Sequence, residues 1–401
     1  MSRAVSADLA SRTPPLAQAA AAALASSSDR HPAKAKAESG DREPGAGAAR
    51  SAGVGVVFNP HSKKNRARPE RFDALQRLVG DRGAVRRTRD VDEVASVAAE
   101  FLRDGIDIWV ADGGDGAFHW LLNAAVAASA ATDRPMPLLM PTRSGTIDFL
   151  AKKVGLQGSA EDLLAALLSD LRRGQAPATI RLDSLRLRGA LRAGGGFDRR
   201  GFACAAAGVG QRFFERFYAN GDPSARGVVT VVSRILASAS LTAPGLSALP
   251  ASLVPRGWLG DSEDPRALGA AVFAPQPLRV EVDGEVLPFA EYRAINVGAI
   301  DIDLAGVFRF FPFAAEEGVL HGLIGNPGVS EVIRLMPAMA RGKPLVSPNI
   351  VDRRLQTLRM TAPAETTIDP VIDGELFFGL SALEISLGAQ VAIALPGGAA
   401  G

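Results

Sequence analysis

The sequence predicts an α/β N-terminal domain with a parallel sheet at residues 52–180, followed by a C-terminal, mainly antiparallel β-sandwich domain at residues 181–396. Three observations carry this prediction. The length of 401 residues fits two or three domains. Up to about residue 180, short apolar runs alternate with stretches of helical periodicity, as in parallel strands joined by crossover helices. Beyond that point apolar and polar residues alternate with period two, which is typical of strands with one face in solvent.

In the first domain, apolar runs rich in β-branched residues predict strands, and apolar residues three to four apart predict helices. Asp90, followed three residues later by Glu93, is a capping pattern that opens a helix, and Gly105 ends it. The strands are expected at 53–58, 106–111 and 137–141, and the helices at 69–79, from Asp90 to Gly105, at 118–128 and from about residue 147.

In the second domain, alternation with period two predicts strands at 180–188, 278–286 and 355–361, separated by Gly- and Pro-rich turns. Residues 228–236 fit a helix or a strand equally well, and residues 242–264 are loop-like. The sequence therefore does not decide the secondary structure of these two stretches.

Residues 1–51 are built mainly from Ala, Ser, Arg, Pro, Gly and Asp. So few large apolar side chains cannot offset the entropy of ordering the chain, so we expect a disordered tail. The alanine-rich run at 18–25 predicts a transient helix rather than a secretion signal.

The composition limits the classes of function. With 45 Lys and Arg against 43 Asp and Glu, the net charge is +2, and nothing suggests a nucleic-acid partner. The single cysteine, Cys204, excludes an internal disulfide and favours a reducing, cytoplasmic compartment. No run of about 18 apolar residues predicts a membrane-spanning helix, so we expect any membrane contact to be peripheral.

The loop at residues 112–117 follows a predicted strand and precedes a predicted helix. Gly113, Gly114 and Gly116 would let the backbone approach a phosphate closely, and the helix N-terminus would favour the anion. Asp115 could hold a phosphate-bound magnesium ion or a ribose hydroxyl. The alternative is that the glycines only turn the chain.

The loop at residues 141–152 also joins a strand to a helix. Ser144, Gly145 and Thr146 offer hydroxyls and little bulk, and Asp148 lies in the expected first helical turn. Helix capping by Thr146 and Asp148 would explain this pattern as well.

These segments together resemble the diacylglycerol kinase catalytic family of lipid kinases, which includes bacterial diacylglycerol kinases, sphingosine kinases and ceramide kinases. The similar segments, in chain order, are Asn-Pro-His-Ser-Lys-Lys at 59–64, Gly-Gly-Asp-Gly-Ala at 113–117, Ser-Gly-Thr-Ile-Asp at 144–148 and Asp-Gly-Glu at 373–375. Asp183 matches a family Asp, and residues 312–320 resemble a further motif, with Glu317 in the place of its Asp.

The resemblance implies a fold like those of NAD kinases and diacylglycerol kinases, and transfer of the γ-phosphoryl group of ATP, with Mg²⁺, to a lipid hydroxyl of diacylglycerol, a sphingoid base or ceramide. Glu375 would accept the proton of that hydroxyl, with Asp373 and Asp115 also catalytic and Asp115 at the metal. The nucleotide would be bound by Asn59, Ser62, Lys64, Gly113, Gly114, Asp115, Gly116, Ser144, Gly145 and Thr146. A membrane lipid is the expected partner, and a homodimer is possible. The expected location is the cytoplasm, with peripheral membrane association.

The chain departs from the family pattern at four places. Ala117 replaces a Thr, Asp148 an Asn and Lys63 a Gly, and the segment after Asn296 differs. The altered loops leave two alternatives open, a soluble nucleotide kinase such as an NAD kinase and a non-catalytic lipid- or nucleotide-binding protein.

Other residues receive a simpler interpretation. The second Asp-Gly-Glu, at 283–285, is expected to be a plain turn between strands. Asp301 and Asp303 fit a solvent-exposed strand face better than a metal site. His61 and His119 are assigned no role.

An acceptor lipid needs an apolar slot in the second domain. Its candidates are Phe213, Phe214, Phe217, Phe308, Phe310, Phe311 and Phe313, with ordinary core packing as the alternative. Residues 212–217, which carry arginine and phenylalanine, are an expected membrane-contacting patch.

Overall fold

The computed structural model describes residues 53–219, 225–241, 264, 266–304 and 308–398. The expected tail at 1–51 lies outside these residues, and so does nearly all of the loop-like stretch at 242–264.

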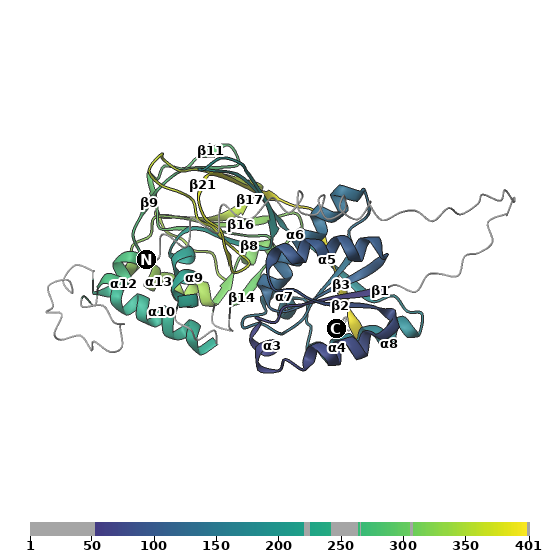
Figure 1. Cartoon of the computed structure of the whole chain (residues 1–401). Helices are drawn as coiled ribbons and strands as arrows, with labels where there is room; N and C mark the ends of the chain where they lie inside the picture. The colour runs from purple at the N-terminus through teal and green to yellow at the C-terminus, as the bar shows by residue number, and fades with distance from the viewer. Residues whose placement is uncertain (1–52, 220–224, 242–263, 265, 305–307, 399–401) are drawn as a thin grey trace.

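The first domain is built on a six-stranded sheet with the strand order β2-β1-β3-β4-β22-β5. All neighbouring strands run parallel except β22 and β5, which are antiparallel. The strands are β1 (Gly53–Phe58), β2 (Gly83–Arg87), β3 (Ile106–Asp112), β4 (Leu138–Pro141), β5 (Ala178–Leu182) and β22 (Val391–Leu395). The helices are α3 (Lys63–Ala67), α4 (Arg71–Val79), α5 (Val91–Arg103), α6 (Asp115–Thr132), α7 (Phe149–Lys153) and α8 (Ala160–Arg172). Helices α5 and α6 cover one face of the sheet, and α4 and α8 cover the other (Figure 1).

The local sequence explains why these elements form where they do. The side chain of Asp90 accepts a hydrogen bond from the amide of Glu93 and caps α5, as the capping pattern predicts. The apolar face of α5 is buried, and Phe101 packs over Gly55 of β1 so closely that a Cβ atom there would stand 2.5 Å from its ring. The central strands are buried on both faces, which accounts for their continuous apolar runs.

Two expectations about the domain boundary are wrong. The predicted single strand at 180–188 is interrupted at Asp183 and Ser184, so that β5 belongs to the first sheet and β6 (Leu185–Leu191) to the second domain. Strand β22 lies inside the range 181–396 assigned to the second domain, yet it pairs with β4 and β5. Its apolar run is buried between those two neighbours, so the end of the chain completes the first sheet.

The second domain is the expected sandwich of two antiparallel six-stranded sheets, ordered β11-β10-β18-β21-β6-β7 and β17-β16-β13-β8-β19-β20. Leu187, Val280 and Ile385 from the first of these sheets share one core with Val297, Ile324 and Ile372 from the second. Besides β6, the strands of these sheets are β7 (Gly196–Gly201), β8 (Ala203–Gly208), β10 (Arg279–Val282), β11 (Glu285–Val286), β13 (Ala294–Gly298), β16 (Leu320–Gly325), β17 (Ile350–Leu355), β18 (Thr357–Thr361), β19 (Val371–Ile372), β20 (Glu375–Leu376) and β21 (Leu380–Leu387). Two short pairs are added, β9 (Gln276–Pro277) with β12 (Glu291–Tyr292) and β14 (Ile302–Leu304) with β15 (Phe308–Phe310).

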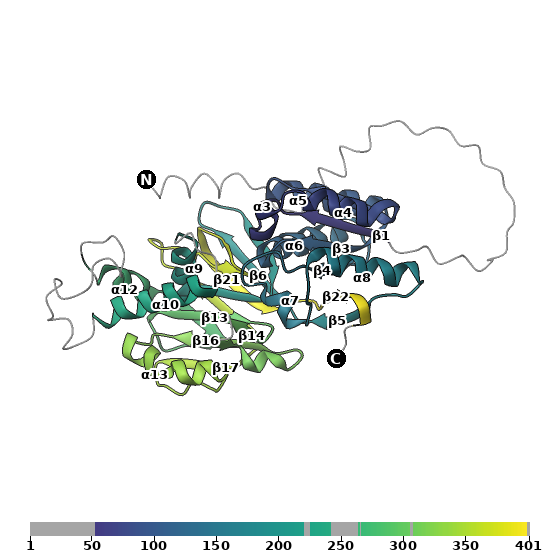
Figure 2. The same ribbon diagram turned by 90° about the horizontal axis from the view of Figure 1, so that it is seen from below.

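A layer of helices lies beside this sandwich, away from the first sheet (Figures 1 and 2). It consists of α9 (Val209–Ala219), α10 (Ala225–Ser240), α12 (Ala267–Val272) and α13 (Val329–Ala340). Residues 228–236, which fit a helix or a strand equally well by sequence, are therefore helical. Phe213, Phe217 and Ile235 belong to a third apolar core within this layer. None of the helices among the described residues is long and apolar enough to span a bilayer.

Candidate active site

The two glycine-containing loops meet at the carboxyl ends of β3 and β4, the edge of a parallel sheet where ligands bind. A Cβ atom on Gly145 would stand 2.4 Å from the Cα atom of Gly114. The two backbones touch at a point where no side chain fits, so glycine is required there for space.

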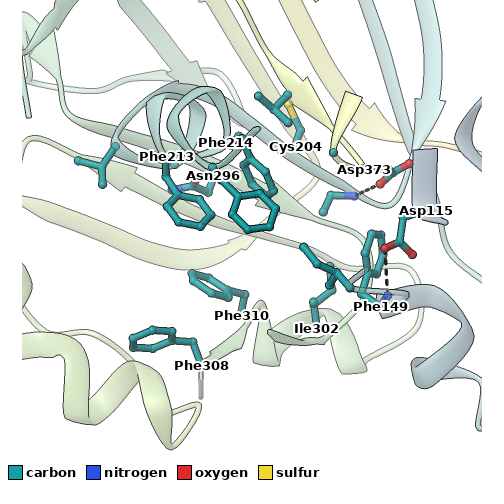
Figure 3. Close-up of a pocket in the computed structure, with 18 of the residues that line it drawn as sticks. Asp115, Phe149, Cys204, Phe213, Phe214, Asn296, Ile302, Phe308, Phe310 and Asp373 are labelled. Carbon is teal, nitrogen blue, oxygen red and sulfur yellow. Dashed lines mark hydrogen bonds between the residues drawn. The ribbon is translucent and has the colours of Figure 1, made fainter. Parts of the chain in front are cut away.

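Asp115 joins the two loops. Its carboxylate accepts hydrogen bonds from the amides of Phe149 at 3.1 Å and Leu150 at 3.2 Å, the first of which is drawn in Figure 3. The amides at the start of α7 are thus bound by Asp115, and the alternative that Thr146 or Asp148 caps this helix is wrong. Burial, with the nearby Asp148 charge as the second cause, raises the pKa of Asp115 to about 7.

Asp148 lies beside Asp115 in a left-handed backbone conformation, with a φ of 51°. Its Oδ1 accepts a hydrogen bond of 2.9 Å from the amide of Gly145. Burial raises the pKa of Asp148, although Lys64 and Lys152 act in the opposite direction. Two carboxyl groups that are costly to ionise therefore lie where the loops meet.

The segment after β1 forms the third side of this region. Asn59 accepts the amide of His61 through its side chain. Ser62 is buried, and its hydroxyl has no hydrogen-bond partner among the described residues. The ammonium group of Lys64 donates to the carbonyl of Arg143. These contacts tie the β1 segment to the loop at 141–152.

A buried polar network beneath the loops was missed by the sequence analysis. Oδ1 of Asp112 accepts hydrogen bonds from the hydroxyls of Ser144 at 2.7 Å and Thr142 at 3.0 Å, and forms an ion pair of 3.3 Å with Arg71. Asn65 donates to Oδ2 of Asp112 and accepts from Arg71. The network fixes three loops to one another. The one indication of it in the sequence is the charge of Asp112 at the end of an apolar strand.

The Asp373-Gly374 turn connects β19 and β20, and both residues have positive φ, 50° and 90°. Oδ1 of Asp373 accepts the amides of Phe202 at 2.8 Å and Ala203 at 2.9 Å, and Oδ2 lies 3.1 Å from Nδ1 of His119. Both oxygens therefore have protein partners, which anchors the turn, and the catalytic role expected for Asp373 stays a prediction.

Glu375 follows this turn and reaches the first domain. A Cβ atom on Gly116 would stand 1.9 Å from Oε1 of Glu375, so the carboxylate packs directly on the first turn of α6. Oε2 accepts a hydrogen bond of 3.0 Å from Nε1 of Trp120. The Asp373–Glu375 turn and the glycine loop are therefore brought together, as the resemblance implies.

The second Asp-Gly-Glu has the same local conformation in a different setting. Asp283 and Gly284 have φ of 51° and 87° in the hairpin between β10 and β11. Glu285 is 65% exposed through its side chain and forms an ion pair with Arg353. The expectation of a plain turn is confirmed.

A cavity of about 580 Å³ extends from the loops into the second domain. Figure 3 shows Asp115 and Asp373 on one side of it and Phe213, Phe214, Phe308 and Phe310 on the other. Of the phenylalanines expected to form an apolar slot, all line the cavity except Phe313, which packs against His321. Further apolar walls come from Ile302, Leu323, Ile324, Val332, Leu335, Met336, Met339 and Leu345.

The expected site residues divide into two groups. Those that line the cavity are Asn59, Ser62, Gly114, Asp115, Gly116, Gly145, Thr146, Asp373 and Glu375. Lys64, Gly113 and Ser144 do not line it. The hydroxyl of Ser144 is buried and donates to Asp112, so it faces the polar network beneath the loops and not the cavity.

The remaining expected residues lie elsewhere or have protein partners. Asp183 accepts hydrogen bonds from the amide of Gly318 and the side chain of Gln390, and Gln390 also donates to Glu317. Asp301 forms an ion pair of 2.6 Å with Arg309. Among the described residues, no group of three or more His, Cys, Asp or Glu side chains is arranged to hold a metal ion.

Comparison with known proteins identifies the first domain. Residues 53–177 match the family model of the diacylglycerol kinase catalytic domain. Two solved structures from Bacillus anthracis strain Sterne resemble the whole fold. One is of a diacylglycerol kinase, with 12% identity over 86% of this chain and 97% of that chain and a TM-score of 0.52. The other is of a protein assigned provisionally as a diacylglycerol kinase, with 14% identity, 86% and 96% coverage and a TM-score of 0.55. Among curated proteins, the search finds no match.

These structural likenesses confirm the expected fold class, an α/β domain followed by an antiparallel sandwich. The segment that matches the diacylglycerol kinase catalytic domain, residues 53–177, contains both glycine loops of this chain.

Proposed function

We propose that this protein is an ATP-dependent lipid kinase, which transfers the γ-phosphoryl group of ATP to a lipid hydroxyl. The observation that carries the proposal is the cavity. One end of it is formed by the glycine loops and Glu375, and the rest of its wall is mainly apolar. A phosphoryl donor and an apolar acceptor would meet where these two parts join.

The polar end has the properties of a phosphate site. Gly114, Asp115 and Gly116 line it at the N-terminus of α6, a helix of 18 residues whose first amides favour an anion. The unpartnered hydroxyl of Ser62 and the exposed cation of Lys63 line the same end. Phosphoryl transfer depends mainly on positioning and charge stabilisation, and these groups supply both.

The acidic groups at this end suit Mg²⁺. Among the described residues, neither Asp115 nor Asp148 forms an ion pair with a basic side chain, and burial makes both carboxyl groups costly to ionise. A divalent cation held by Asp115 would offset that cost. When bound, Mg²⁺ would neutralise charge on the phosphates during transfer.

Glu375 is the proposed general base. The acceptor hydroxyl would give its proton to Oε1, the oxygen that faces Gly116, while its own oxygen forms the new bond to the γ-phosphorus. The bond from that phosphorus to the bridging oxygen breaks, and ADP leaves. Asp373 would hold the turn that carries Glu375.

The apolar wall favours a lipid acceptor over NAD. The volume of the cavity lies within the range of sites for small organic ligands. The phenylalanine, leucine and methionine side chains of this wall offer few hydrogen-bond partners to a second nucleotide. Diacylglycerol, a sphingoid base and ceramide all present a primary hydroxyl on an apolar body.

We also propose that the enzyme associates peripherally with anionic membranes through α13 and the loop after it. Val332, Leu335 and Met336 of α13 line the cavity, whereas Ile333 and Val346 are exposed at 40% and 82%. Arg334, Arg341 and Lys343 are exposed in the same segment, and there is no acidic residue between positions 333 and 346. Anionic headgroups complement that charge.

The membrane patch expected at 212–217 does not fit this role. Phe213 and Phe217 are buried in the helical layer, and Arg212 donates to the carbonyls of Val272 and Ala274.

Incubation of the purified protein with γ-labelled ATP, Mg²⁺ and a panel of diacylglycerol, a sphingoid base, ceramide and NAD tests the proposed function. Label in a lipid product supports it. Label in NAD indicates a nucleotide kinase, and ATP binding without any labelled product indicates a non-catalytic homologue.

A further inference from the structure

Helix α6 carries three neighbouring side chains that contact the second domain. His119 lies against Asp373, Trp120 donates to Glu375, and Asn123 both donates to the carbonyl and accepts from the amide of Arg200. The same helix begins with Asp115 in the glycine loop. One rigid element therefore connects the phosphate end of the cavity with the turn that carries Glu375.

The indole of Trp120 is itself held in place by its surroundings. The ring of His119 meets it edge to face at 5.5 Å, and the ring of Phe377 lies 5.8 Å away. The guanidinium of Arg199 lies 5.8 Å from the indole and also covers Phe197 and Phe377. Trp120 therefore presents its N–H to Glu375 from a fixed direction.

Glu375 needs such support. It is the first residue of a strand only two residues long, at the edge of its sheet, and its side chain has three rotatable bonds. Among the described residues, the hydrogen bond from Trp120 at 3.0 Å is the one that holds its carboxylate. Because Oε2 accepts this bond, Oε1 is left facing Gly116 and the phosphate end of the cavity.

We infer that Trp120 is a positioning residue, which orients the carboxylate of Glu375 for proton abstraction. This inference rests on the proposed function, in which Glu375 is the general base. Trp120 does not line the cavity and is not expected to touch either substrate.

Kinetics of Trp120→Phe test the inference, because phenylalanine keeps an aromatic ring and loses the N–H donor. We expect kcat to fall about ten- to a hundred-fold, with KM for ATP within about two-fold of wild type. Trp120→His, which keeps an N–H donor, should recover part of kcat.

Trp109→Phe is the matched control. Its indole is buried in the core around the first sheet, where it donates to the carbonyl of Ile106 at 2.9 Å and has no contact with Glu375 among those described. The same loss of an indole hydrogen bond there should lower the unfolding temperature and leave kcat unchanged. An unchanged kcat in Trp120→Phe would overturn the inference.

A measurement without turnover separates this inference from the proposed function. The chain has three tryptophans, and the indole N–H resonance of Trp120 can be assigned by its loss in Trp120→Phe. It should shift in Glu375→Gln and stay in place in Glu285→Gln. If Glu375→Gln leaves it unmoved, the contact does not form and the inference fails. If it moves while the wild-type protein phosphorylates no acceptor, the contact stands and the proposed function, with the positioning role that rests on it, fails.

Discussion

Glu375 packs directly on Gly116: a Cβ atom on the glycine would stand 1.9 Å from Oε1 and 2.9 Å from the carboxyl carbon of the glutamate. The two residues belong to different domains, at the start of α6 and in the last pair of strands of a sandwich sheet. Gly116 has no positive φ, so glycine is needed at this position for space rather than for backbone conformation.

Gly116→Ala should therefore separate stability from activity. The added methyl group displaces Glu375, and we expect kcat to fall about a hundred-fold. Alanine is the better helix former by roughly 1 kcal/mol, so the unfolding free energy should stay equal or rise. Urea denaturation and initial rates measure the two effects. Gly196→Ala, at a strand position with open space around it, should change neither kcat nor the site.

Asp115→Asn should change how stability depends on pH. The pKa of Asp115 is raised to about 7 by burial, so its protonated form favours the folded state at acid pH, and that contribution is lost as the pH rises from about 4 through 7. Asparagine does not titrate. The unfolding free energy of Asp115→Asn relative to wild type should therefore increase between pH 5 and pH 8. Urea denaturation of both proteins without nucleotide or Mg²⁺ measures this difference. If the difference in unfolding free energy between the two proteins stays constant across that range, burial does not raise the pKa of Asp115.

Val346→Asp should weaken binding to vesicles that contain phosphatidylserine by about ten-fold, because it places a negative charge in an exposed apolar position among cations. Ile333→Asp should act in the same direction. Met136→Asp, an exposed apolar residue of the first domain, is the control and should bind like wild type. Co-sedimentation at two salt concentrations measures the effect. Equal binding by all three variants would place the membrane contact elsewhere.

The strands of the first domain were predictable because they are buried. Burial on both faces makes β1, β3 and β4 continuous apolar runs, and this pattern is visible in the sequence alone. The position of β22 was not predictable. Its five residues look like any buried strand, and only tertiary pairing with β4 and β5 assigns it to the first sheet.

The site was predictable in part for the same reason. The glycine loops follow strands directly, and their residue types suffice to mark them. The two Asp-Gly-Glu turns, at 283–285 and 373–375, by contrast have the same residues and nearly equal φ angles. Only their surroundings distinguish them. Arg71 and Trp120 carry no local pattern, since their partners Asp112 and Glu375 lie 41 and 255 residues away.

The central claim is that Glu375 is the general base, and the paired variants Glu375→Gln and Glu285→Gln test it most directly. Glutamine keeps the size and hydrogen bonding of glutamate but cannot take a proton. With the acceptor lipid, kcat of Glu375→Gln should fall about 10²- to 10⁴-fold while ATP binding stays near wild type, and Glu285→Gln should be nearly silent. Retained kcat in Glu375→Gln, or a loss confined to Glu285→Gln, would contradict the account.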